Sequence, residues 1–194
     1  MENSSIQEQF DIKKIRLIVG LGNIGRAYVN SRHNVGFDFT EKLAGTRRFL
    51  EEPKLKALMY MGDFEGEKKT FAEPTTMMNV SGESVSLIMK FYKIKAEEIL
   101  VIHDDLDLRL GSYKLQFNKG PKIHNGILSI ENRIGTSKFW RLRIGVDNRE
   151  MSIRNEISGA DYVLGHFKID ETKMLEDVFF DVRGDLLKQN NKNL

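Results

Sequence analysis

The sequence contains no cysteine and only three prolines among its 194 residues. The absence of cysteine excludes disulfide bonds, thiolate metal sites and cysteine nucleophiles. Long hydrophobic runs are also absent, since none approaches the roughly 18 residues that a membrane-spanning helix needs. The opening stretch MENSSIQEQFDIKK is polar and lacks the apolar segment of a secretory signal. These absences predict a cytoplasmic protein with no membrane partner.

The composition predicts one folded domain. Hydrophobic residues make up 40% of the chain and charged residues 30%, which is ordinary for a globular protein. A chain of this length can bury one sizeable core. We expect a single domain over residues 13–188, with flexible tails at 1–12 and 189–194. The net charge of +2 is too small to indicate a nucleic-acid partner by itself.

Hydrophobic patterns predict strands interleaved with helices. The runs IRLIVG (15–20) and ILVIHDD (99–105) are typical of buried strands, and the run 139–146 alternates so that Arg141 and Arg143 share one face. Further strands are predicted at 112–117 and, around a turn, in 56–74; helices are predicted at 35–45, 79–92, 124–134 and 170–187. This interleaving indicates an α/β layered fold, and the hairpin at 56–74 indicates a mixed sheet.

The stretch IVGLGNIGRAY contains Gly20, Gly22 and Gly25 in the pattern G-x-G-x-x-G, at the end of a predicted strand. In a dinucleotide-binding fold the third glycine opens a helix, and a second parallel strand ends in an acidic residue about 20 residues on. Here a polar, loop-like stretch follows, and the later segment FTEKLAG is predicted as helix. The context disfavours a nicotinamide enzyme. We interpret the glycines as a tight turn that lets the backbone and Asn23 approach a cleft.

Four stretches place polar residues at the ends of predicted elements: GLGNIGRAYVNSRHNVG, PTTMMNVSG, VIHDDLDL and IHNG. Asn23 and Asp104 each follow a strand, while Asn79 and Asn125 each stand at a predicted helix start. Open α/β sheets bind ligands beyond the carboxyl ends of their strands, so these side chains are candidates for one site. Each also has a structural interpretation, because asparagines are good helix caps and an acidic residue can simply end a strand.

These motifs, together with WRLRIGV and DYVLGHF, resemble bacterial peptidyl-tRNA hydrolases; they occur in the family's order and cover most of residues 15–167. The resemblance implies a monomeric α/β/α layered fold with a mixed, mostly parallel twisted sheet flanked by helices. It implies hydrolysis of the ester between a peptide and the 3′-terminal ribose of tRNA, with no metal and no cofactor. The implied partner is peptidyl-tRNA, bound through its acceptor stem, its 3′ end and the peptide backbone.

The resemblance also implies roles for individual residues. His33 matches the family's general base, Asp104 the carboxylate that supports it, and Asn23 the position linked to the blocked amino group of the peptide. Taken singly, His33 is also compatible with a loop histidine bonded to the backbone. Met77 stands where the family usually has an aromatic residue. The positions implied to bind substrate or tRNA are Tyr28, Met77, Asn79 and Asn125.

Ester hydrolysis suits these residue types. A histidine can take a proton from water near neutral pH, and a neighbouring carboxylate can fix its tautomer. Asparagine amides can stabilise the developing oxyanion. No G-x-S-x-G motif is present, so water is the expected nucleophile. Metal binding is not expected, because no two histidines have i, i+4 spacing, and His103 and His166 are interpreted as structural.

Residues 108–143 carry a concentrated positive charge. Eight lysines or arginines minus one acid, Glu131, give +7 in a chain whose total is +2. Segregated positive charge is typical of proteins that bind the phosphates of nucleic acids. We therefore consider Lys114, Arg141 and Arg143 candidate phosphate contacts. The alternative interpretation is that the two arginines form half-buried structural pairs.

The chain departs from the family pattern before His124, where NKGPKI (118–123) replaces most of a glycine-rich run. Pro121 fixes a backbone angle that glycine leaves free, which predicts a stiffer and more basic loop over the cleft. Such changes leave His33 and Asp104 intact. They nevertheless motivate an alternative function, that of a divergent tRNA-binding paralogue with weak or no turnover.

Overall fold

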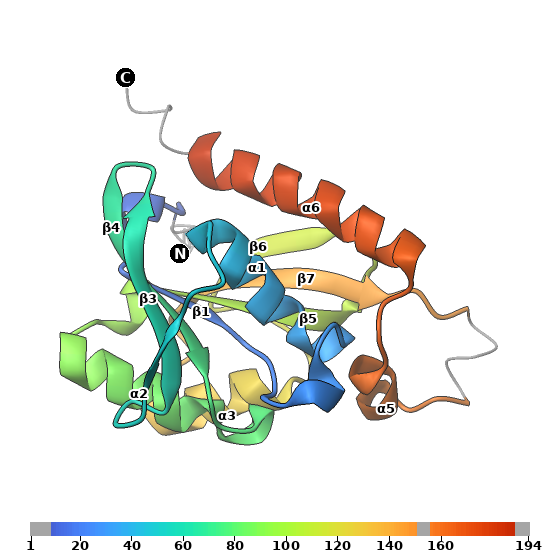
Figure 1. Ribbon diagram of the computed structural model, residues 1–194, viewed down its shortest axis with the longest axis horizontal. Helices are drawn as coiled ribbons and strands as arrows, with labels where there is room; N and C mark the ends of the chain where they lie inside the picture. The colour runs from blue at the N-terminus through green and yellow to red at the C-terminus, as the bar shows by residue number, and fades with distance from the viewer. Residues whose placement is uncertain (1–8, 151–155, 189–194) are drawn as a thin grey trace, which may run out of the picture.

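A computed structural model describes residues 9–150 and 156–188. Seven strands of these residues form one sheet in the order β2-β3-β4-β1-β5-β7-β6 (Figure 1). The bounds are β1 Leu17–Gly20, β2 Leu50–Glu52, β3 Ala57–Phe64, β4 Glu67–Pro74, β5 Ile99–Arg109, β6 Tyr113–Phe117 and β7 Trp140–Asp147. The four central strands β4, β1, β5 and β7 are parallel, and the outer strands pair antiparallel. The predicted mixed sheet is confirmed.

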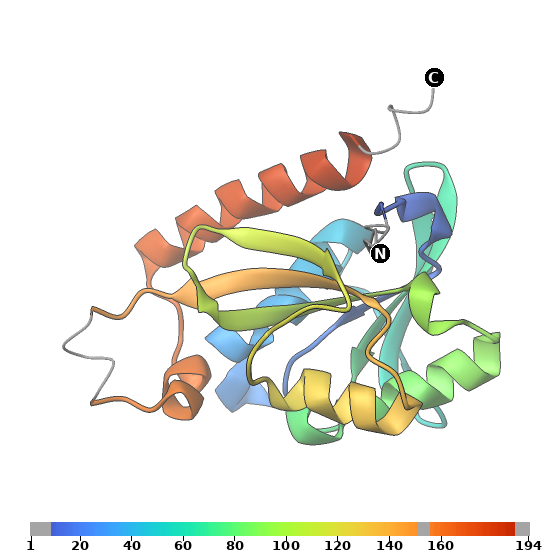
Figure 2. The same cartoon turned by 180° about the vertical axis from the view of Figure 1, so that it is seen from behind.

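Helices cover both faces of the sheet, as Figures 1 and 2 show. The bounds are α1 Val35–Ala44, α2 Ser81–Tyr92, α3 Asn125–Ile134, α5 Gly159–Leu164 and α6 Ile169–Lys188. α1 and α6 lie on one face, and α2 and α3 on the other, with a hydrophobic core between the sheet and each pair. This α/β/α layering confirms the predicted fold class. No helix in the described ranges is long and apolar enough to cross a membrane.

β1 is buried on both faces, which explains its unbroken apolar sequence. Leu17 and Val19 point into the core beneath α2 and α3, while Ile18 points into the core beneath α1 and α6. Gly20 ends the strand where α1 crosses it, and a Cβ there would lie 2.4 Å from the carbonyl oxygen of Gly36. This glycine therefore allows the close approach of β1 and α1.

The glycine-rich stretch does not open a helix. Two short 3-10 turns, Arg26–Tyr28 and Arg32–Asn34, follow Gly25, and α1 begins only after them. Gly25 itself has a φ of 115°, a conformation that favours glycine. The structure thus agrees with the interpretation of a tight turn and lacks the helix of a dinucleotide-binding fingerprint at this place.

The segment before β1 is part of the core. Phe10 and Ile12 are buried, and the ammonium of the buried Lys69 donates hydrogen bonds to the carbonyls of Ile12 (2.8 Å) and Ile15 (2.7 Å). The expectation of a flexible tail is therefore wrong for residues 9–12, because two apolar side chains and one ammonium attach them to the domain. The rest of the predicted tails, residues 1–8 and 189–194, lies outside the described residues.

β5 is longer than the predicted strand, since it continues past Asp105 to Arg109. It pairs with β7 from Leu100 to Asp105 and, after a shift in register, again at Arg109. Asp104 and Asp105 therefore lie inside the strand rather than at its end, and both are buried. The sequence patterns also do not predict two short elements, β2 and α5.

Glu73 on β4 is a buried acid next to two other acids. The residue is 4% exposed, and its Oε1 has no hydrogen-bond partner among the described residues. Burial, and then repulsion from Glu41 and Asp38 of α1, raises the pKa of Glu73 from 4.5 to about 8. The folded protein therefore keeps Glu73 protonated at neutral pH, whereas the unfolded chain ionises it.

Glu73→Gln should gain stability relative to wild type as the pH rises from 4.5 to about 8, and the gain should level off above that range. The wild type loses stability across this window because its unfolded state releases the proton first, while the amide has no proton to release. The full gain is expected to be a few kcal/mol, at about 1.4 kcal/mol per pKa unit. Urea unfolding between about pH 5 and about pH 9 measures it. Glu67→Gln on the same strand is the control, and a gain that does not vary with pH contradicts the prediction.

Candidate active site

A cleft of about 560 Å³ opens where β1 ends and beside β5. Its walls come from the loop after β1, the turn before α2, β5, the start of α3 and α5. Seven of the predicted site residues line it: Asn23, Tyr28, His33, Met77, Asn79, Asp104 and Asn125. Lys114, Arg141 and Arg143 are not among the lining residues.

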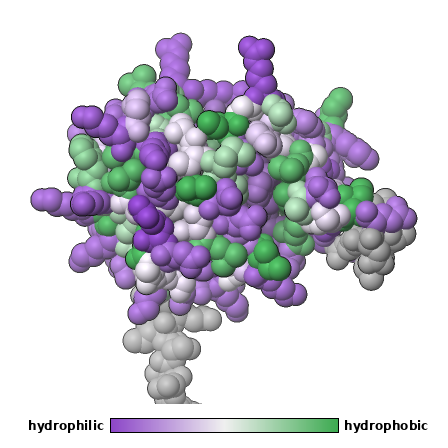
Figure 3. Space-filling model, turned by 90° about the horizontal axis from the view of Figure 1, so that it is seen from below, coloured by the Kyte–Doolittle hydropathy of each residue, from purple (hydrophilic) through white to green (hydrophobic). Residues whose placement is uncertain are grey.

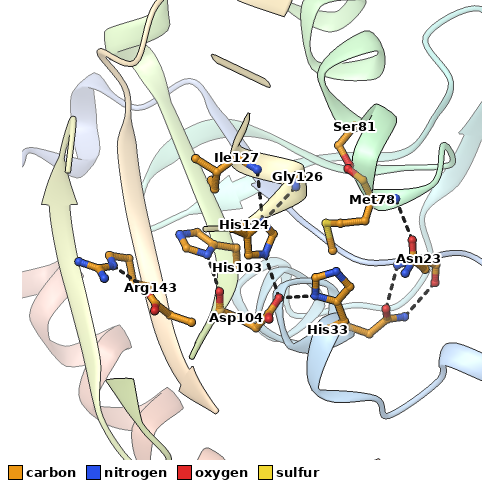
Figure 4. Close-up of polar contacts among 12 residues, drawn as sticks. Asn23, His33, Met78, Ser81, His103, Asp104, His124, Gly126, Ile127 and Arg143 are labelled. Atoms are coloured by element: carbon orange, nitrogen blue, oxygen red, sulfur yellow. Dashed lines mark hydrogen bonds and ion pairs between the residues drawn. The ribbon is translucent and has the colours of Figure 1, made fainter. Parts of the chain in front are cut away.

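The buried carboxylate of Asp104 connects two histidines (Figure 4). Its Oδ1 lies 2.7 Å from His33 Nδ1 and 3.0 Å from His124 Nε2, and the residue is 2% exposed. Burial by itself raises the pKa of Asp104, but the charges of His124 and His33, with hydrogen bonds from both rings, hold that pKa well below its usual range. The carboxylate therefore stays ionised and accepts a hydrogen bond from each ring.

His124 has its tautomer fixed by the backbone of α3. Its Nδ1 accepts hydrogen bonds from the N–H groups of Gly126 (3.1 Å) and Ile127 (3.3 Å), so its proton lies on Nε2, which faces Asp104. The same bonds make His124 the N-cap of α3, whereas Asn125, the expected cap, is the first helical residue and is exposed in the cleft. The sequence analysis gives His124 no role. The one sequence feature that points to a capping role is its position at the start of the predicted helix 124–134.

His33 presents its second ring nitrogen to the cleft. The hydrogen bond to Asp104 places the proton of a neutral ring on Nδ1 and leaves the lone pair on Nε2. Nε2 has no hydrogen-bond partner among the described residues, and His33 lines the cleft. The structure thus brings together His33 and Asp104, the two residues that the sequence pattern links, in an arrangement suited to taking a proton from a molecule in the cleft.

Comparisons with known proteins show the family of this chain. A family model described as Peptidyl-tRNA hydrolase matches residues 17–189. The chain belongs to the peptidyl-tRNA hydrolase family. It is 41% identical over 165 residues to the peptidyl-tRNA hydrolase of Staphylococcus saprophyticus, covering 84% of this chain and 85% of that one. It is 41% identical over 158 residues to that of Bacillus anthracis, covering 81% and 83%. The crystal structure of the peptidyl-tRNA hydrolase from Acinetobacter baumannii matches with a TM-score of 0.80 at 35% identity, over 92% of this chain and 89% of that chain.

In this peptidyl-tRNA hydrolase family member, the cleft residue Asn23 is bonded to Asn34, the neighbour of His33 in the chain. The side chain of Asn34 accepts a hydrogen bond from the backbone N–H of Asn23 (2.8 Å) and donates one to its carbonyl (2.9 Å). The side-chain oxygen of Asn23 accepts from the N–H of Met78 (2.8 Å). Asn23 is therefore held at both its backbone and its side-chain oxygen. Its Nδ2 donors have no acceptor among the described residues.

Arg32 attaches the turn that carries His33 to the C-terminal part of the fold. Its guanidinium lies 2.7 Å from Glu171 Oε2, donates to the carbonyl of His166 at 2.6 Å, and stacks 4.3 Å from the ring centre of Tyr162. Both members of the ion pair are buried. His33 thus stands between two residues, Arg32 and Asn34, whose side chains are both fixed.

Arg141 and Arg143 are buried, at 3% and 7% exposure, and both are paired. Arg141 forms an ion pair with Glu131 at 2.5 Å, and Arg143 forms one with Asp105 at 2.6 Å. The structure therefore contradicts the expectation that these arginines contact phosphate, and it favours the alternative of structural pairs. Lys114 lies exposed on the edge strand β6, outside the cleft.

The same two arginines hold the loop 118–123, which leads from β6 to α3 (Figure 2). A nitrogen of Arg141 donates to the carbonyl of Gly120, and a Cβ on Gly120 would lie 2.4 Å from the guanidinium carbon of Arg143. The N–H of Lys122 donates to the carboxylate of Asp107 at 3.0 Å. The loop beside the cleft is thus attached to the sheet at several points.

His33, Asp104 and His124 are the described residues that could hold a metal ion, since one ligand atom from each lies within 4.8 Å of the others. The i, i+4 criterion does not detect this cluster. However, the proton of His124 occupies Nε2. Coordination through that nitrogen would move the proton to Nδ1 and break both hydrogen bonds that cap α3. The arrangement fits proton transfer better than metal coordination.

Two replacements of His124 should separate its two contacts. His124→Ala removes the cap of α3, which costs about 0.5–2 kcal/mol, and a hydrogen bond to a buried charge, which costs about 1.5–3 kcal/mol. His124→Asn keeps a good capping residue and should recover the first part only. We expect the free energy of unfolding to fall from wild type to His124→Asn to His124→Ala in urea titrations. Equal losses in both variants would contradict the capping role.

Proposed function

We propose that the chain hydrolyses the ester bond between a peptide and the 3′-terminal ribose of tRNA, releasing free tRNA. The observation that carries the proposal is the geometry of His33 in this family's fold. Its Nδ1 is held at 2.7 Å by the ionised, buried Asp104, and its Nε2 faces a cleft. The matched relatives bear this activity in their names.

In the proposed reaction His33 acts as general base. A water molecule in the cleft gives a proton to Nε2 as its oxygen attacks the carbonyl carbon of the ester. The ionised Asp104 stabilises the imidazolium that forms, without taking the proton itself. The imidazolium then protonates the 3′-oxygen of the ribose as the bond between this oxygen and the carbonyl carbon breaks. The peptide is released as a carboxylic acid, which gives its proton to solvent. Positioned base catalysis of this kind contributes about 10²–10⁴-fold.

The amides around His33 supply donors for the substrate. Asn23 is fixed with its Nδ2 donors available, and we propose that it binds the peptide next to its blocked amino group and stabilises the developing oxyanion. Asn79 and Asn125, both exposed in the cleft, bind the substrate backbone, and Tyr28 and Met77 contact its tRNA end. No step needs a metal or a cofactor. A monomeric state and a cytoplasmic location stay predictions from the sequence.

The first test is hydrolysis of N-acetyl-aminoacyl-tRNA compared with free aminoacyl-tRNA. Wild type should cleave the blocked substrate preferentially. His33→Ala and Asp104→Asn should lose about 10²–10⁴-fold in kcat, because the first lacks the base and the second the charge that stabilises its protonated form. His166→Ala, a replacement of an exposed histidine outside the cleft, is the matched control and should retain wild-type kcat.

Two outcomes would overturn this assignment. Retention of kcat in His33→Ala would show that another group activates water. Tight tRNA binding by wild type with no cleavage of any blocked substrate would instead support the tRNA-binding paralogue.

A second test concerns the phosphate contacts. Because Arg141 and Arg143 are buried, we propose that the exposed lysines nearby, Lys114, Lys119 and Lys122, contact the tRNA backbone. Lys114→Ala should weaken tRNA binding and lower the slope of log K against log salt by about 0.7–1. Lys54→Ala, next to β2 at the opposite edge of the sheet, is the control. An equal change of slope in both variants would contradict the proposal.

A further inference from the structure

The cleft lining contains polar and aliphatic residues. The polar lining includes His33, Asp104 and the amides of Asn23, Asn79 and Asn125. The aliphatic lining consists of Leu106, Ile123, Ala160, Val163 and Leu164. The proposed ester hydrolysis uses the polar lining, so the aliphatic lining has no role in it.

Ile123 is the most exposed side chain of the aliphatic lining. It is 82% exposed, although burying an isoleucine side chain is favourable by about 1.5–3 kcal/mol. Figure 3 shows the surface of the protein from below. On this face hydrophobic patches lie among hydrophilic side chains, without one continuous apolar area. An exposed aliphatic side chain at the mouth of a cleft is thus a local feature that an occupant of the cleft could cover.

The loop that carries Ile123 is held in place. Arg141 binds the carbonyl of Gly120, and Asp107 accepts from the N–H of Lys122, directly before Ile123. His124, directly after it, is fixed by Asp104 and by the start of α3. The backbone on both sides of Ile123 is therefore held in place without a ligand, which lowers the cost of ordering this segment on binding.

The short helix α5 supplies three of the five aliphatic lining residues, Ala160, Val163 and Leu164. It begins at Gly159, where a Cβ would lie 2.9 Å from Leu106, so the helix packs closely on the floor of the cleft. Leu164, near its end, is 42% exposed and Val163 is buried. Leu106 of β5 thus packs beside α5, and the loop residue Ile123 lines the same cleft.

We propose that this aliphatic lining forms a subsite for an apolar side chain of the peptide, near the ester. The inference rests on the proposed peptidyl-tRNA hydrolase function. Side chains such as leucine, valine or phenylalanine would cover Ile123, Leu106 and Leu164 and gain the free energy of burial. A nucleobase would need a planar stacking partner and hydrogen bonds to its edges, which these five aliphatic residues do not supply. The walls therefore favour the peptide over the terminal nucleotide.

The test compares hydrolysis of N-acetyl-aminoacyl esters on a single tRNA body. In the first series the residue esterified to tRNA is leucine, valine, glycine or aspartate. In the second series glycine is esterified to tRNA, and the residue before it in the peptide is varied in the same way. Wild type should show kcat/KM about 10-fold or more higher for leucine than for glycine or aspartate in one of the two series. The series that shows the preference identifies which residue occupies the subsite.

Ile123→Ser and Leu164→Ser should reduce the leucine-to-glycine ratio about 3- to 10-fold, with little change in kcat/KM for glycine. Both residues are exposed, so neither change removes core packing. Ile123→Leu should keep the preference. Leu128→Ser is the matched control, because Leu128 is 44% exposed on α3 and is not among the cleft residues.

Three results would overturn the proposal. Equal rates for all side chains in both series would show that no such subsite exists, while the hydrolase function stands. Equal losses for every substrate in Ile123→Ser would assign the residue to the tRNA end. Absence of hydrolysis with all substrates would refute the proposed function itself, and the subsite with it.

Discussion

The site depends on one buried negative charge, the carboxylate of Asp104. Removing an ion from water costs several kcal/mol unless hydrogen bonds replace its hydration. Here the replacement comes from two imidazole rings that donate to the same oxygen, His33 at 2.7 Å and His124 at 3.0 Å. The carboxylate and the rings therefore stabilise one another's orientation. Any change that displaces one ring leaves a charge partly unpaired in the interior.

Each ring is in turn fixed by a different part of the fold. His124 is held by the first backbone N–H groups of α3, which need an acceptor at any helix start. His33 is held through its neighbours, since Arg32 binds Glu171 at the start of α6 and Asn34 binds the backbone of Asn23. The close approach of α1 to β1 at Gly20 brings this turn to the edge of the sheet. Segments distant in sequence thus determine the positions of His33 Nδ1 and His124 Nε2, the two nitrogen atoms bonded to Asp104.

The sequence was sufficient for the layered architecture and for most of the strands and helices, because periodic apolar patterns are local signals. Polar residues at element ends indicated Asn23, Asn79, Asp104 and Asn125, whereas the family resemblance indicated His33, Tyr28 and Met77. It did not reveal the roles of His124, Arg141 and Arg143. The role of His124 depends on which atoms face it across the cleft, and no periodicity records that. The arginines were misinterpreted because a count of charges along the chain does not show Asp105 and Glu131 arriving beside them. Phe10 and Ile12 were assigned to a tail because two isolated apolar residues carry little pattern.

Adjacent residues of β5 connect the catalytic pair to the loop beside the cleft. Successive side chains of a strand point to opposite faces, so Asp104 meets the histidines while Asp105 meets Arg143. Arg143 lies beneath Gly120, and the loop from there to Ile123 forms a wall of the cleft. Breaking a buried ion pair such as Asp105–Arg143 typically costs about 3–5 kcal/mol, because the remaining charge stays in the interior. The unpaired charge would then lie next in sequence to the carboxylate that orients His33. β5 therefore constrains two parts of the site. Through Asp104 it orients His33, the proposed base, and through Asp105 and Arg143 it supports the loop that lines the cleft at Ile123.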